Sequence, residues 1–236
     1  MRLRSFEIDD RVKVKLDKSI AEADSGLHGY MKFGEANDYP QVCEKIINGS
    51  VDAKACSDIY AKFLIGGGFE NEALNSIVVG RDVRNKDVTL LEVLRQVSKQ
   101  VANHQGYYLH ANMNLARKIG SSMVIPFKNC RFSKVDDNGY CAKIGVYPNW
   151  HKEKGEKFDK NKINWYPIFN VNENAFEEVV ANNGGADSFK GMVYFHFLDN
   201  QYFYPLSLVD AIYLDADTQS QIAIFKNRQI RSGFAK

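Results

Sequence analysis

Three consecutive glycines, Gly66 to Gly68, follow the apolar run "IYAKFLI" and are the first residues whose type and spacing could support chemistry. Glycine-rich loops bind phosphate through backbone N–H groups, and a P-loop requires the pattern G-x-x-x-x-G-K-[ST] between a strand and a helix. No Gly-Lys-Ser/Thr occurs in this sequence, and the residues before the glycines have helical periodicity. Because a helix C-terminus presents carbonyl oxygens, we interpret the glycines as a helix stop and a tight turn.

The histidines and cysteines come next, because both residue types bind metal ions. His104 and His110 straddle the end of an expected helix, so the two imidazoles do not share one helix face. Cys130 and Cys141 flank an expected hairpin, in which Cys141 would lie opposite about residues 133–134 and not opposite Cys130. Structural zinc sites usually contain close ligand pairs, and no C-x-x-C occurs here. We therefore expect no metal site.

Catalytic side chains are not singled out either. The sequence has no G-x-S-x-G elbow, and no Cys–His dyad stands out. Asp136 and Asp137 could act as paired carboxylates, but Asp-Asp-Asn-Gly is a strong hairpin-turn sequence, which we favour. The lysine-rich segment 152–162 could contact phosphates, but its interspersed acidic residues favour a solvated loop. We expect no catalytic, cofactor-binding or metal-binding residues, and no cofactor.

The bulk composition is that of an ordinary globular protein, long enough for one or two domains with a sizeable core. Lysine and arginine number 31 and acidic residues 29, and the net charge of +2 is too small to indicate a dedicated nucleic-acid binder. Aromatic residues make up 12% of the chain, which suits a β-containing core or a large interface, and we favour the core.

The cysteines are expected to be free thiols. The start of the sequence, "MRLRSFEIDDRVKVKL", lacks the apolar core of a signal peptide, so a reducing cytoplasm is the default compartment. No run approaches the ~18 apolar residues that span a membrane, and we expect no membrane contact. The four cysteines are Cys43, Cys56, Cys130 and Cys141.

Two helices are predicted before the glycines. "DYPQVCEKIINGS" reads as a short helix, with Pro40 at the first helical position and Gly49 just after the last. Ser50 is a good N-cap for a second helix, which runs into the triple glycine. An apolar stripe with a spacing of four residues follows one face of the second helix, as in an amphipathic helix, and consists of Val51, Ala55, Ile59 and Phe63.

The clearest amphipathic helix is "NKDVTLLEVLRQVSKQVANHQG". Asp87 is the N-cap candidate and Gly106 the expected stop. Its apolar positions are Leu90, Leu94, Val97 and Val101.

After Gly106 the sequence indicates antiparallel strands, which are rich in aromatic and β-branched residues and separated by turns. We expect strands in "GYYLHANMN", "SSMVIPF", "CRFSKV", "YCAKIGVY", "INWYPIFNVN" and "GMVYFHFLD". The segment from residue 207 to the end should form a long helix, in which Ser207 and Asp210 resemble a capping box and Gly233 is the expected stop. Its acidic residues precede its basic residues, an order that complements the helix dipole.

These features predict an α+β fold in three parts. Residues 1–37 look irregular, apart from one short edge strand in "RVKVKL". Residues 38–206 would form the α+β domain, and residues 207–236 the long helix. The chemistry of the residues leads no further than an α+β domain without catalytic features.

The order of the motifs resembles the N-terminal part of tailed-phage portal proteins, especially those of phages and prophages of Bacteroidetes-type bacteria. "KFGEANDYPQVCEKIINGS" is similar to that family's G-x-x-N-x-Y-P opening, and "AKACSDIYAKFLIGGGF" to its next helix. Pro126, Phe127 and Arg131 in "MVIPFKNCRF" match its V-P-F-x-x-x-R element. The resemblance continues in "LLEVLRQVSKQVANHQGYYLHANMN", in "VYPNWHKEKGEKFDKNKINWYPIFN", and in "YPLSLVDAIYLDADTQSQIAIFKNRQIRSGF".

The resemblance implies a portal-wing-like fold and a structural, non-enzymatic role. Portal subunits form a head–tail connector ring, usually a dodecamer, at one vertex of the viral capsid. DNA passes through this ring during packaging and ejection, and the ring also nucleates virion assembly. ATP is hydrolysed by the terminase, which agrees with the lack of a nucleotide loop here. Portal subunits are longer than this chain, so we expect a fragment, a split gene or a prophage remnant that lacks stem and clip.

The implied partners are other copies of the chain in the ring, the terminase large subunit, and capsid and tail or adaptor proteins. Double-stranded DNA in the channel would be contacted without sequence specificity. The implied location is the portal vertex of the virion, with the host cytoplasm as the site of assembly. Two other function classes remain open. The chain could be an unrelated α+β protein-binding module, or an uncharacterised enzyme.

Overall fold

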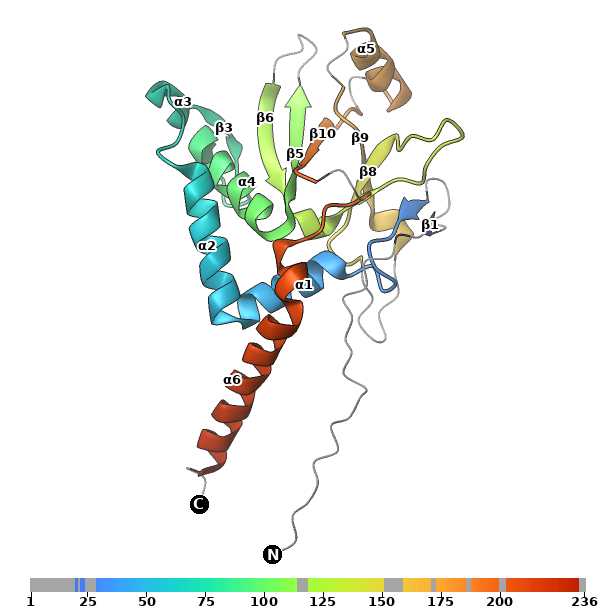
Figure 1. Ribbon diagram of the computed structural model, residues 1–236. Helices are drawn as coiled ribbons and strands as arrows, with labels where there is room; N and C mark the ends of the chain where they lie inside the picture. Colours follow the sequence, from blue (N-terminus) through green and yellow to red (C-terminus); the bar gives the residue numbers. More distant parts are fainter. Residues whose placement is uncertain are drawn as a thin grey trace, which may run out of the picture.

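Figure 1 shows the fold in a computed structural model, in which helices and antiparallel sheets are mixed along the chain. The predicted α+β class is therefore confirmed. The predicted edge strand at residues 11–16 lies outside the described residues, as does most of the lysine-rich segment 152–162. The structure describes residues 20, 22–23, 29–113, 119–150, 159–170, 173–185, 188–199 and 203–233.

The elements follow one another as short helices, hairpins and one long terminal helix. The helices are α1 (Tyr39–Gly49), α2 (Val51–Ile65), α3 (Glu72–Asn75), α4 (Leu90–His104), α5 (Glu173–Asn182) and α6 (Tyr213–Gly233), with 3-10 turns η1 (Phe127–Asn129), η2 (Lys160–Lys162) and η3 (Leu208–Ile212). The strands are β1 (Glu22–Ala23), β2 (Tyr30–Met31), β3 (Val78–Arg81), β4 (Asp87–Thr89), β5 (Gly106–Met113), β6 (Ile119–Ile125), β7 (Cys130–Phe132), β8 (Lys143–Val146), β9 (Asn164–Pro167) and β10 (Met192–Phe197).

Ser50 joins the first two helices. Its N–H donates to the carbonyl of Ile46 at the end of α1, and its hydroxyl accepts from the N–H of Ala53 in α2, so the predicted N-cap is confirmed. Gly49 is the last residue of α1 and not a residue beyond it, so the helix extends further than predicted. At the other end of α2 the N–H of Gly66 donates to the carbonyl of Lys62, which confirms the helix stop.

The apolar stripe predicted along α2 is not the face that the fold buries. The small residues Ala53, Ser57 and Ala61 face the protein, where α2 packs against α4. The predicted apolar stripe lies on the opposite side and is exposed to solvent. Small side chains let two helices approach closely, and this close approach determines the buried face.

The ends of α4 also differ from the prediction. Thr89 is the N-cap, and it forms a capping box with Glu92 in which each side chain accepts from the other residue's backbone N–H. Asp87 lies two residues earlier, in β4, because the unpredicted hairpin of β3 and β4 occupies this segment. The helix ends at His104, Gln105 adopts the left-handed conformation, and Gly106 begins β5.

The predicted strands form two antiparallel three-stranded sheets. One sheet has the order β10-β5-β6, and α4 contacts both β5 and β6. The other has the order β7-β8-β9, and a parallel bridge between Ile168 and Val193 connects the two sheets. The hairpin turn at 136–139 is confirmed by the bond from the Gly139 N–H to the Asp136 carbonyl. Cys141 pairs with Val135, one or two positions from the predicted partner at 133–134.

The long helix at the end of the chain is confirmed, with a 3-10 turn as its first part. The hydroxyl of Ser207 accepts from the N–H of Val209 and not from Asp210, so the predicted capping box is replaced by a cap of η3. In Figure 1, α6 leaves the body beside α1 and points away from the sheets. No helix in the described part of the chain has both the length and the apolar character of a membrane span.

The main core lies where α1, the strands β5, β7 and β10, and the residues before α6 meet. It is rich in stacked and edge-on rings. Phe132 lies edge-on to Phe195 at 4.9 Å between centroids, and Phe33 stacks on Tyr39 at 4.2 Å. The aromatic residues therefore serve mainly as core, as the composition suggested.

Candidate functional site

Two of the sequence motifs, "KFGEANDYP" and "MVIPFKNCRF", meet in the interior of the protein. Arg131 on β7 reaches back to Asn37, just before α1. Its Nε donates to Oδ1 of Asn37 at 2.6 Å, and its Nη2 donates to the Asn37 carbonyl at 2.8 Å. Asn37 has a φ of 58°, a left-handed conformation that asparagine tolerates better than most residues. The two sequence elements thus hold each other in place.

Arg131 is fully buried, and all its hydrogen bonds within the described part of the chain go to carbonyl and amide oxygens. Its Nη1 donates to the Cys130 carbonyl at 2.7 Å and its guanidinium lies 5.7 Å from the ring centre of Trp150. Burial lowers the pKa of this guanidinium from its usual high value, yet the group remains charged at neutral pH. A buried cation satisfied by fixed dipoles orders the backbone around it. Arg131 therefore has a structural role.

Two tyrosines connect the start of the described chain with its end. The hydroxyl of Tyr204 donates to the Met31 carbonyl at 2.9 Å and accepts from the Phe132 N–H at 3.0 Å. The hydroxyl of Tyr39 accepts from the Ser207 N–H at 3.1 Å. Tyr39 and Tyr204 begin the segments "YP" and "YPLS" of the sequence. Their hydrogen bonds orient the residues from which η3 and α6 begin.

One partly buried cluster of ionisable groups lies among α1, α4 and η1, in which His104 is buried and Lys128 reaches solvent. Nζ of Lys128 is 2.7 Å from Glu44, and Nε2 of His104 is 3.3 Å from the other carboxylate oxygen of Glu44. Burial lowers the pKa of His104, so the imidazole is neutral at pH 7 and donates a hydrogen bond. Burial alone would raise the pKa of Glu44, but the bonds from His104 and Lys128 lower it overall. The buried His104 ring stacks on Phe127, and the cluster has the character of a structural contact.

The cysteines do not assemble into a reactive or metal-binding group. Burial raises the pKa of the Cys43 thiol to about 12, and it also raises the pKa of Cys130, so both are protonated and poor nucleophiles. All four cysteines are free thiols. Within the described residues, no three His, Cys, Asp or Glu side chains gather as metal ligands.

The exposed apolar face of α2 is the first candidate contact surface. The side chains of Val51, Ile59 and Phe63 are 77%, 67% and 81% exposed. They follow one another along the side of α2 that points away from α4. Large apolar side chains that gather on one exposed face are typical of protein–protein contacts.

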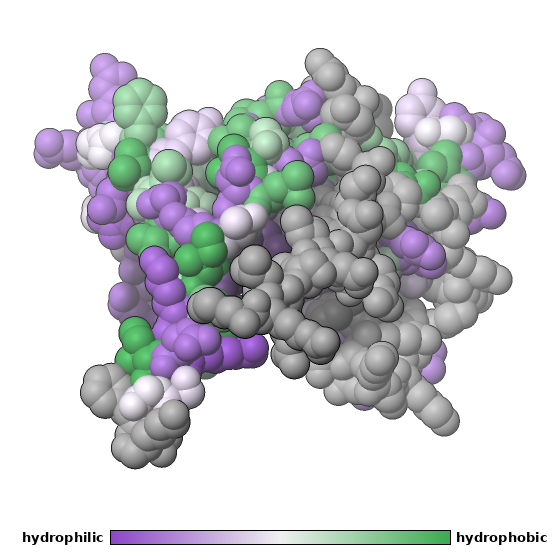
Figure 2. Space-filling model, turned by 60° about the horizontal axis from the view of Figure 1, so that its bottom comes forward, coloured by the Kyte–Doolittle hydropathy of each residue, from purple (hydrophilic) through white to green (hydrophobic). Residues whose placement is uncertain are grey.

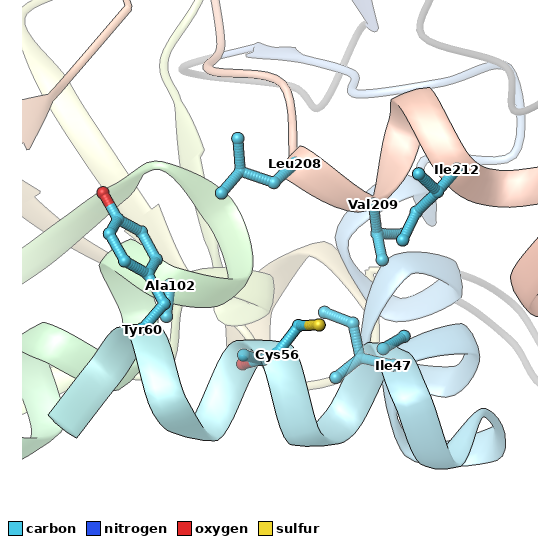
Figure 3. Close-up of a pocket in the computed structure, with 9 residues that line it drawn as sticks. Ile47, Cys56, Tyr60, Ala102, Leu208, Val209 and Ile212 are labelled. Carbon is cyan, nitrogen blue, oxygen red and sulfur yellow. The ribbon is translucent and has the colours of Figure 1, made fainter. Parts of the chain in front are cut away.

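An apolar cleft of about 160 Å³ lies between α2, α4 and η3. Figure 3 shows Cys56 and Tyr60 rising from α2 toward η3, with Leu208 and Val209 above them. Leu208 is 55% exposed at the edge of this cleft. The side chains that line the cleft are uncharged and mostly apolar, which suits the seating of an apolar group.

The second half of α6 is the most exposed part of the described chain. Tyr213 and Ala216 are buried against the body, but every residue from 221 to 233 is exposed over about 20 Å of helix. Figure 2 shows hydrophobic and hydrophilic side chains side by side along the arm at the lower left. The exposed apolar residues of this half are Ile222, Ile224, Phe225 and Ile230.

The comparison with solved structures finds a similar fold. A protein chain in the structure described as the virion of a native gene transfer agent particle matches with a TM-score of 0.51 and 8% sequence identity. The two chains share a fold. The match covers 80% of this chain and 45% of the other, so this chain spans less than half the length of the protein that it resembles.

A second chain, from a structure described as the neck of an empty gene transfer agent particle, matches with a TM-score of 0.47 and 10% identity. That match covers 81% of this chain and 46% of the other. Its score lies below 0.5, so the likeness of fold rests on the first chain. No protein-family model matches the sequence, and no curated protein does.

Proposed function

We propose that the chain is a structural subunit of a phage portal, the ring that connects head and tail and through which DNA is packaged and ejected. In this proposal residues 38–206 form the wing-like body, residues 207–236 begin the helix that leads toward the stem, and residues 1–37 form an N-terminal arm. The shared fold with a chain of a virion particle supports a virion component.

The observation that carries the proposal is the exposed half of α6. A single helix of this length is only marginally stable without packing. Its apolar side chains lie on several sides of the helix, a pattern typical of a helix that is covered from more than one direction. A ring of identical subunits covers each such helix from both sides.

The proposed role needs no catalytic residues, no cofactor and no metal. The partners are other copies of the chain, the terminase large subunit, and capsid and tail or adaptor proteins, with double-stranded DNA in the channel. The near-neutral charge suits a conduit, because strong phosphate contacts would slow moving DNA. The location is the portal vertex of the virion, and assembly takes place in the host cytoplasm.

Electron microscopy of the complete gene product, expressed with any coding sequence that follows this segment, tests the proposal. Rings with a central channel are expected. Particles without rings at high protein concentration would contradict a portal and favour a separate binding module. A large terminase gene nearby in the genome is a second expected observation.

A further inference from the structure

The charged residues of α6 are separated by sign. Asp215 and Asp217 lie in its first turns, and Lys226 and Arg228 in its exposed half. Within the described part of the chain none of these four groups has an ion-pair partner, and no acid stands four residues from a base along this helix. The charges are therefore available to a partner outside the chain.

Each aspartate of α6 can be matched with a basic residue at the same spacing along the helix. Asp215 to Lys226 and Asp217 to Arg228 are each 11 residues, as counted from the sequence. Eleven residues are about three helical turns and about 16 Å along the axis. The members of each pair thus lie at nearly the same angle around α6, and the two pairs lie on opposite flanks.

Between these two charged flanks, α6 has one face toward the body and one face away from it. In the first half of α6, Tyr213, Ala216 and Ser220 face the body, and Leu214, which is 68% exposed, faces outward with Thr218. In the second half, the face that continues from Ala216 and Ser220 has left the body and carries Ala223, Asn227 and Ile230, all of them exposed. One half of α6 therefore offers an outward face, and the other half a free inward face.

We propose that α6 of one copy packs against α6 of the next copy, in parallel and shifted by three turns. The inward face of the second half of one helix covers the outward face of the first half of its neighbour, with Leu214 seated beside Asn227. Asp215 then pairs with Lys226 on one flank, and Asp217 with Arg228 on the other. Neighbours related by rotation keep the same orientation, so flank residues at equal angles meet across the contact.

This contact rests on the proposed ring and adds its register. It is heterologous, because one face meets a different face on the next copy. Helices packed about 8–10 Å apart with a shift of about 16 Å must be steeply inclined to the ring axis. A parallel contact without the shift would place aspartates beside aspartates and arginines beside arginines, which is unfavourable.

Disulfide trapping in the full chain tests the register. A Leu214→Cys chain and an Asn227→Cys chain, each also carrying Cys56→Ser, are mixed in equal amounts and oxidised, and heterodimers are counted on a non-reducing gel. At least about fivefold more disulfide-linked dimer is expected from the mixture than from either chain alone, because only the mixture holds a pair of cysteines whose Cα atoms come within the 4.4–6.8 Å or so that a disulfide needs.

The matched control mixes Leu214→Cys with Gln229→Cys. An antiparallel pair of helices would also bring these acids and bases together, but it would join residues 214 and 229. Trapping of the control pair in preference to the test pair would overturn the parallel contact. An absence of trapping in both mixtures would overturn the contact altogether.

Charge reversal provides a second readout. Asp215→Lys with Asp217→Lys should abolish the trapped heterodimer, and so should Lys226→Asp with Arg228→Asp. A chain with all four changes should restore it, which a merely destabilised helix would not.

Rings in electron micrographs together with failed trapping would overturn this register and leave the portal role standing, whereas the absence of rings would count against the portal role.

Discussion

At the scale of single residues, backbone geometry explains the triple glycine. Gly66 has φ 53° and ψ −129°, a conformation that is strained for every residue with a Cβ atom. Gly68 is also in positive φ, and a side chain there would meet Asn75. The glycines therefore end α2 and turn the chain, and they have no phosphate-binding geometry because they follow a helix.

Gly66→Ala should lower the free energy of unfolding by about 1 kcal/mol, since alanine is strained at positive φ. Denaturant unfolding with circular dichroism measures the change. Gly67→Ala is the matched control, because Gly67 has no positive φ and open space around it, and it should be nearly neutral. Equal stabilities of the two variants would contradict the cap.

The buried His104 should make the stability depend on pH. Its pKa is lower in the folded state than in the unfolded chain, where it is about 6.5. The unfolded state thus binds the proton more readily, and stability is lost as the pH falls below about 6.5 toward the folded pKa. His104→Phe, which keeps the stacking on Phe127, should flatten the dependence of the unfolding midpoint on pH between 7 and 5. An unchanged slope in the variant would show that another group is responsible.

At the scale of elements, the sequence placed most helices and strands correctly but misjudged their edges and faces. The periodicity of α4 is clear, yet the β3–β4 hairpin before it was not predicted, because its strands have only four and three residues. The face of α2 was misjudged for a different reason. Its small residues Ala53, Ser57 and Ala61 pack against α4, and apolar periodicity alone does not show which helix face has a neighbour.

The two candidate caps of α4 can be separated by experiment. Thr89→Ala removes the capping box and should cost about 1 kcal/mol of stability. Asp87→Ala, at the residue that the sequence favoured, removes an exposed ion pair with Arg81 and should cost less than about 0.5 kcal/mol. Thermal or denaturant unfolding decides between them, and a larger loss for Asp87→Ala would restore the sequence-based cap.

At the scale of the whole molecule, the chain divides into a packed body and an exposed helical half. Among the residues that the structure describes, the buried side chains of α6 lie in its first turns, and Ser50 and Asp52 hydrogen-bond Gln219 there. Two apolar surfaces of the described chain remain uncovered, the outer face of α2 and residues 221–233 of α6. Such an arrangement is typical of a subunit whose assembly completes the burial of apolar surface.

A chain that ends at Ser220 should therefore keep its fold. Cooperative thermal unfolding with a nearly unchanged midpoint is expected, because residues 221–233 are all exposed. Self-association, measured by sedimentation at high concentration, should decrease relative to the full chain. A strongly lowered unfolding midpoint would show that the exposed half stabilises the body.

The sequence by itself determined the α+β class, the helix stop at the glycines and the hairpin turn at 136–139, because each follows from local periodicity or turn chemistry. It also supplied the motif order, although not the reason for it. Only the tertiary structure showed that Asn37 and Arg131, far apart in the chain, share a buried network. It also decided which apolar faces are covered. Burial depends on neighbours that are distant in sequence, and local patterns do not contain them.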